Sequence, residues 1–242
     1  MSLQTPAWRV AGLALLLSGW SAAGQGTFQN LDFESGSLVP AGAFQVQFAP
    51  AFPGWIGTVG GVQQSIALSN TIYLDTSGIS IIDQNYRGGG IPGGLIQGSY
   101  TAVLQAGYGS GVPANTSLVQ TGLVPANAES LQFQAFQSVD GGTAIIPFAV
   151  TMSGQTLSLV PMASGANYTL YGANIRSWAN QTVQLSFTAF AESPHSDNQY
   201  LFLDAIRFSD QSVPEPSVFG LSALGALLLG WRVLGRRRCG RN

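Results

Sequence analysis

An all-β fold, an antiparallel β-sandwich of the jelly-roll type, is predicted by three features of this 242-residue chain. Apolar and polar residues alternate over short runs, the pattern of strands with one buried and one solvated face. Clusters of glycine, proline, asparagine and serine separate these runs, as in sandwiches and barrels. Between residues 25 and 213 no run has the period of a long amphipathic helix.

The predicted strands follow one another through residues 25–212, a length that suits one domain with a sizeable core. Alternation is unbroken in residues 44–48, 131–135 and 183–189. Shorter candidates are residues 79–82, 100–105, 147–152 and 200–208. We expect turns where glycine and proline gather, in residues 88–94, 107–113 and 140–142.

Residues 1–24 have the anatomy of a secretory signal peptide. Arg9 precedes the apolar run 10–17, and small residues follow as far as Gly24. Because the run is too short to span a bilayer, we predict cleavage after Ala23 or Gly24 and export of the remainder.

The composition of the exported part excludes several classes of protein. The chain has no lysine. Between residues 25 and 213 it has three basic residues, Arg87, Arg176 and Arg207, and ten acidic residues. Such an acidic body has no surface for nucleic acid. A single cysteine, Cys239, excludes a disulfide framework and a thiolate zinc cluster.

The C-terminal segment 213–242 consists of three parts. Pro214-Glu215-Pro216 comes first, the apolar run 218–234 second, and a basic tail, residues 236–241, third. This run is 17 residues long, which is at the lower limit for a transmembrane helix. The arginines after the helix hold this end in the cytoplasm, so the body lies outside.

This order of parts resembles the sorting signal of PEP-CTERM proteins, which Gram-negative bacteria that make exopolysaccharide export and an exosortase processes. The resemblance implies that Pro214, Glu215 and Pro216 are the recognition motif, and that the stop signal is formed by Arg236, Arg237 and Arg238. The implied partners are an exosortase-like enzyme, the export machinery and the inner membrane. Processing would release the protein to the cell surface or extracellular matrix; the alternative is a permanent single-pass anchor.

The body is similar to galactose-binding-like β-sandwiches, the fold of many carbohydrate-binding modules. The similar patterns are residues 31–34 (Leu-Asp-Phe-Glu), residues 53–55 (Pro-Gly-Trp), and the close of the body at residues 201–208. The resemblance implies that the first and last strands pair, and that polysaccharide is a partner.

If these strands pair, Asp32, Glu34 and Asp204 approach one another. Calcium prefers such hard oxygen ligands, so a structural calcium is one interpretation. The alternative is that Asp32 and Glu34 face solvent and that Asp204 caps a turn or pairs with Arg207 or Arg176.

Trp55 and Trp178 are the candidate carbohydrate-binding residues, because an exposed aromatic face stacks on the C–H face of a sugar. The alternative, which we favour for each of them, is a place in the core. The low charge and the many amides and hydroxyls suit a neutral polysaccharide.

Catalysis is the weaker hypothesis. His195 is the only histidine, and no nucleophile-elbow motif is present. A glycosidase needs only two carboxylates, so a secreted carbohydrate-active hydrolase is the alternative function. We therefore expect a non-catalytic, exported surface or matrix protein that is structural or binds carbohydrate, without a cofactor other than the calcium discussed above.

Overall fold

The computed structural model describes residues 25–72, 76–88, 92–109, 112–140, 145–191 and 198–214. The predicted signal peptide, the apolar run 218–234, the basic tail and His195 lie outside these residues, as do Glu215 and Pro216 of the motif. Within the described part of the chain, no helix has the length and apolar character needed to cross a membrane.

Two β-sheets make up the structure. The larger sheet has the strand order β1 (Pro40–Gly42), β2 (Gln45–Gln47), β5 (Ile66–Ser69), β6 (Gly78–Ile82), β7 (Thr101–Gly109), β16 (Asn198–Ser209), β10 (Ser130–Asp140), β14 (Thr169–Asn174), β13 (Val160–Ser164), and β8 (Val112–Ala114) pairs with β7. The smaller sheet has the order β12 (Gln155–Thr156), β11 (Ala149–Met152), β15 (Thr182–Ala189), β9 (Thr116–Leu123), β3 (Ile56–Val59), β4 (Val62–Gln63). The pairings are antiparallel except that of β5 with β6.

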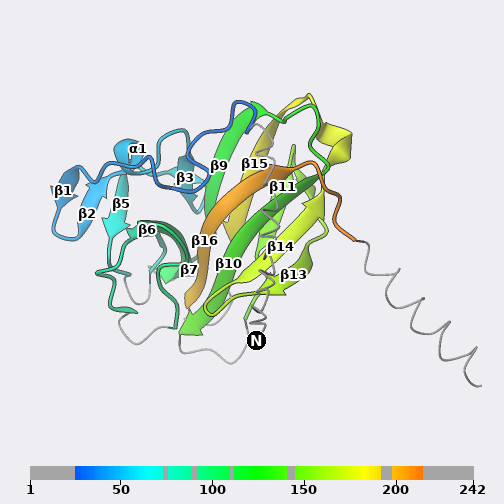
Figure 1. Cartoon of the computed structure of the whole chain (residues 1–242). Helices are drawn as coiled ribbons and strands as arrows, with labels where there is room; N and C mark the ends of the chain where they lie inside the picture. Colours follow the sequence, from blue (N-terminus) through cyan, green and yellow to red (C-terminus); the bar gives the residue numbers. More distant parts are fainter. Residues whose placement is uncertain are drawn as a thin grey trace, which may run out of the picture.

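The two sheets enclose one main core, as an all-β sandwich requires. Figure 1 shows β16 and β10 in front of β9 and β15, with β1, β2, α1 (Phe48–Ala51) and β5 grouped to the left. Phe133 of β10 meets Phe187 of β15 edge to face, with ring centroids 5.1 Å apart. Both side chains are fully buried. This contact fixes the spacing of the sheets at their centre.

Four of the predicted strands are confirmed. Residues 79–82, 131–135, 183–189 and 200–208 lie in β6, β10, β15 and β16. In β15 the residues that alternate with the exposed ones are buried, as period-2 patterning requires. The expected absence of a long helix in the body agrees with the described helical elements, α1 and the 3-10 turn η2 (Arg176–Trp178), which have four and three residues.

Two predictions need correction. In residues 44–48, only 45–47 are a strand, because the backbone turns at Phe44 and the buried Phe48 begins α1. Residues 31–34 form turns instead of the predicted first strand, because Asn30 and Phe33 adopt positive φ. The segment nevertheless lies against the last strand, since the Ile206 amide donates to the Leu31 carbonyl at 2.9 Å.

Candidate functional site

A hollow of about 790 Å³ lies where the chain crosses from the smaller sheet to the larger one. Strand β4 belongs to the smaller sheet, and β5, two residues further on, belongs to the larger. The crossing is fixed by backbone hydrogen bonds from Gln64 to Gly57 and from Phe48 to Ser65, each 2.9 Å long. The volume is in the range of small-molecule sites.

The side chains that surround this hollow, which we call the amide hollow, are uncharged. They are Ala41, Gln47, Phe48, Ala49, Pro50, Trp55, Gln63, Gln64, Ser65 and Ile66. Gln47, Gln63 and Ser65 are exposed, so their amides and hydroxyl are open to a ligand. The Gln64 side-chain amide donates to the Val62 carbonyl at 2.8 Å, which orients it.

Trp55 lies at the base of the hollow and is mostly a core residue. Its side chain is only 4% exposed, and its indole Nε1–H donates to the Asn30 carbonyl at 3.0 Å. The ring packs between Phe33 and Phe187, at centroid distances of 5.9 and 6.2 Å. So little exposed area leaves an edge, and not a ring face, for a ligand; the core alternative describes this residue.

Trp178 is placed elsewhere. It belongs to η2, is half-buried and packs against the main core from outside. Trp178 lines neither the amide hollow nor a smaller hollow that Phe148 and Tyr171 line. The structure therefore does not bring the two predicted tryptophans into one site.

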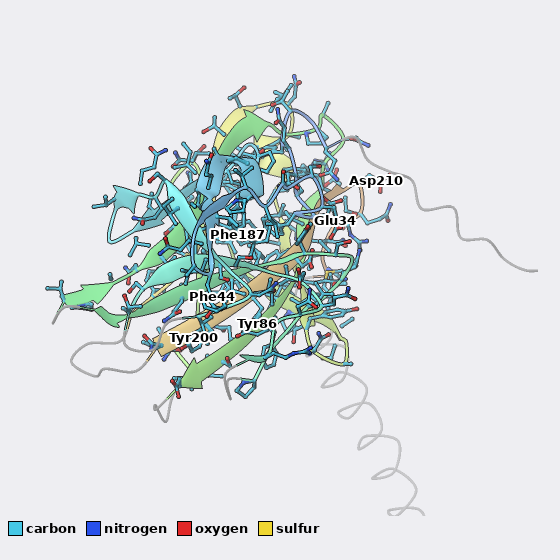
Figure 2. All side chains as sticks on the ribbon, turned by 90° about the vertical axis from the view of Figure 1, so that its left-hand side faces the viewer. Glu34, Phe44, Tyr86, Phe187, Tyr200 and Asp210 are labelled. Carbon is cyan, nitrogen blue, oxygen red and sulfur yellow. The ribbon has the colours of Figure 1, made fainter. Side chains whose placement is uncertain are left out.

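Asp204 and Glu34, two of the three predicted calcium ligands, both accept hydrogen bonds from the segment 97–101. Asp204 Oδ2 accepts hydrogen bonds from Thr101 Oγ1 at 2.7 Å and from the Gln97 amide at 3.2 Å. Glu34 Oε1 accepts from the amides of Ser99 and Tyr100, at 2.8 and 3.0 Å. The carboxylates therefore hold residues 97–101 against the middle of β16 (Figure 2 labels Glu34).

Asp204 is 1% exposed, and burial raises the pKa of its carboxyl to about 7. The hydrogen bonds from Thr101, Ala205 and Gln97 act against this rise, and the nearby Glu34 charge adds to it. The two arginines considered as partners are engaged with other groups. Arg207 donates twice to Gln132 Oε1, and Arg176 pairs with Glu129 at 3.5 Å.

The groups around the Asp204 carboxylate are hydrogen-bond donors more than they are oxygen ligands for a cation. Asp204 Oδ1 accepts the Ala205 amide, and Asp32 Oδ1 accepts the Glu34 amide. Calcium on Asp204 and Glu34 would have to displace several of these N–H groups, since both compete for the same carboxylate lone pairs. Among the described residues there is no group of three or more His, Cys, Asp or Glu side chains that could hold a metal ion.

Asp204, whose pKa is raised, and the nearby Glu34 are one pair of carboxylates to compare with a glycosidase arrangement. Both accept hydrogen bonds from residues 97–101. Neither the amide hollow nor a second hollow of about 300 Å³, between Phe148 and Tyr171, is lined by a carboxylate.

Sequence reasoning missed Gln47, Gln63 and Gln64. Their signal was present in the repeated glutamines of residues 45–47 and 63–64, but nothing in the sequence indicates that these two stretches adjoin.

Comparison with known proteins gives one structural similarity. No protein-family model matches the chain, and no curated protein matches it. The structure is similar to that of TmCBM61, solved in complex with β-1,4-galactotriose, with 12% sequence identity and a TM-score of 0.44. The match covers 78% of this chain and 100% of that chain.

Proposed function

We propose that this protein is a non-catalytic carbohydrate-binding protein, and that the amide hollow is its binding site. The observation that carries the proposal is the lining: exposed glutamine and serine side chains around an apolar base, with no charged group. Amides both donate and accept, so they match the hydroxyls of a sugar. An uncharged lining favours a neutral polysaccharide over an acidic one, because no cation is present in the hollow to pair with a carboxylate or sulfate.

We expect Gln63→Ala and Gln47→Ala each to weaken polysaccharide binding about three- to tenfold, the effect of losing one neutral hydrogen bond. The measurement is retardation of the full-length protein in native gels that contain different neutral and acidic polysaccharides. Gln184→Ala is the matched control, because Gln184 is an exposed glutamine on β15 that does not line the hollow. Raising the salt concentration should change the affinity little.

Absence of retardation by every polymer would overturn the carbohydrate-binding proposal. The better interpretation would then be a passive structural protein of the matrix. Release of sugar from a retarding polymer would instead indicate the hydrolase.

We also propose that the sandwich is of the galactose-binding-like class. This class is supported by the contact of Leu31 with β16, which sets the opening segment beside the closing strand. A structural calcium on Asp32, Glu34 and Asp204 is the alternative to the donors that hold Glu34 and Asp204. The calcium alternative is tested by urea unfolding with calcium and with a chelator.

We further propose export, and sorting to the cell surface or matrix by an exosortase-like enzyme. Support comes from the sequence of residues 1–24 and 213–242. The body reaches the start of this second segment, because Asn174 Oδ1 accepts the Val213 amide at 2.7 Å and Asn174 Nδ2 donates to its carbonyl at 3.1 Å.

Sorting can be tested by fractionation of a host that has an exosortase. We expect Pro214→Ala combined with Pro216→Ala to leave the uncleaved protein in the inner membrane. A control change in the body, Gln184→Ala, should not affect its delivery. Equal delivery of the double variant would count against the motif, and an uncleaved wild-type protein would favour the permanent anchor.

A further inference from the structure

Phe44 occupies a backbone position that a bulky side chain rarely takes. It is the second residue of the two-residue loop that joins β1 to β2, and its φ is 56°. The corresponding loop between β3 and β4 is Gly60-Gly61, and that between β11 and β12 is Ser153-Gly154. Gly60, Gly61 and Gly154 follow the usual preference for glycine at positive φ, and Ser153, at φ 48°, is a small residue there, whereas Phe44 is bulky and stores strain.

Burial does not explain why a phenylalanine is present. The Phe44 side chain is 68% exposed, a high value among the large hydrophobic side chains described. The backbone is nevertheless held in place, because the Ser69 amide donates to the Phe44 carbonyl at 2.9 Å. Strained backbone that the surrounding structure holds in place clusters at functional sites, so an exposed aromatic side chain on such a backbone points to a function.

Phe44 is close in sequence to two residues that line the amide hollow. The β1–β2 hairpin supplies Ala41 and Gln47 to the hollow, and each is three residues from Phe44. Three residues of extended chain span at most about 10 Å. A sugar chain that begins in the hollow therefore needs only a few units to reach the ring. Figure 2, in which the side of β1 and β2 faces the viewer, labels Phe44.

We propose that Phe44 is a stacking platform for a further sugar unit of a chain whose neighbouring units lie in the amide hollow. The ligand would then be an extended stretch of a neutral polysaccharide, not a single sugar. The proposal rests on the proposed function, because it assumes that the hollow binds carbohydrate. The exposed ring face would pack against the apolar C–H face of a sugar, and the hollow would supply hydrogen bonds.

The test compares Phe44→Gly, Phe44→Tyr and the wild-type full-length chain against a polymer that retards the wild type, and against its monosaccharide. We expect Phe44→Gly to weaken polymer binding about tenfold, since stacking and the buried area are lost. Monosaccharide binding should change little, and Phe44→Tyr should bind the polymer as the wild type does. The thermal midpoint of Phe44→Gly should be unchanged or higher, because glycine relieves the strain.

Val112→Ala is the control for loss of exposed apolar surface. Val112 is 64% exposed, lies on β8 and does not line the hollow. If Gln63→Ala weakens polymer binding and Phe44→Gly does not, the role of Phe44 is overturned while the proposed function stands. If Phe44→Gly instead alters the oligomeric state in sedimentation without altering polymer binding, the ring is a self-association contact and the proposal is wrong. Failure of the wild type to bind any polymer would overturn both.

Discussion

Between about pH 4 and pH 7 the protein is expected to lose stability as the pH rises, and Asp204→Asn is expected to remove most of that loss. The reason is the burial of Asp204, which raises the pKa of its carboxyl from an ordinary 3.8 to about 7. The buried carboxyl is more stable in its neutral form, because its hydrogen bonds do not fully replace the water it has lost.

The sign follows from proton binding in the two states. Below about pH 4 the carboxyl is protonated in both the folded and the unfolded chain, so Asp204 costs nothing. As the pH rises, the unfolded chain releases its proton first, and the free energy of unfolding falls until the folded carboxyl also ionises near pH 7. The pKa difference corresponds to roughly 4 kcal/mol, of which structural relaxation will remove a part.

The measurement is urea unfolding of the full-length protein at several pH values, with Asp204→Asn and the control Asp210→Asn. Asp210 is an exposed acid six residues further along, so its variant should keep the wild-type pH dependence. A wild-type stability that does not fall with pH would contradict the prediction.

A bound calcium would reverse the expected trend. The cation would hold the carboxylates of Asp204 and Glu34 in their ionised forms, so stability would rise with pH and a chelator would lower it at neutral pH. The same series of unfolding curves, with calcium and with chelator, therefore decides between amide donors and calcium as the partners of Asp204.

Alternation of apolar and polar residues predicts a strand best where it is also an alternation of burial. This holds along the whole of β15 and in the last part of β16, from Ala205 to Ser209, whereas the first residues of β10 and of β16 are buried without interruption. The turn at Phe44 could not be predicted, because phenylalanine is not a residue that favours positive φ.

The candidate site was less accessible to sequence reasoning. Gln47 and Gln63 adjoin only because the chain crosses between sheets after β4, a long-range feature without a local pattern. Asp204 is a candidate from the sequence, but its partners among residues 97–101 are the Gln97 amide and the Thr101 hydroxyl, and no local pattern links residue 204 to either of them. For Trp55 the sequence leaves core and platform open, since an aromatic residue near a turn suits either environment, and the structure buries the side chain.

Trp55→Ala is expected to destabilise the protein by about 3–5 kcal/mol, as large-to-small changes of buried aromatic residues do. The change removes ring contacts with Phe33 and Phe187 and leaves the Asn30 carbonyl without its indole donor. Trp55→Phe should lose less, roughly 1–3 kcal/mol, because a ring remains and only the hydrogen bond and part of the volume are lost. Urea unfolding followed by far-UV circular dichroism measures both effects.

Trp178→Ala is the comparison that separates core from platform. Trp178 is half-buried on the outside of the main core, so its removal should cost less than that of Trp55. If Trp55 is a core residue that only borders the amide hollow, Trp55→Phe will retain most polysaccharide binding while its unfolding midpoint falls. A Trp55→Ala protein that unfolds at the wild-type urea concentration, yet no longer binds the polymer, would instead show that the indole serves the ligand and contributes little to the core.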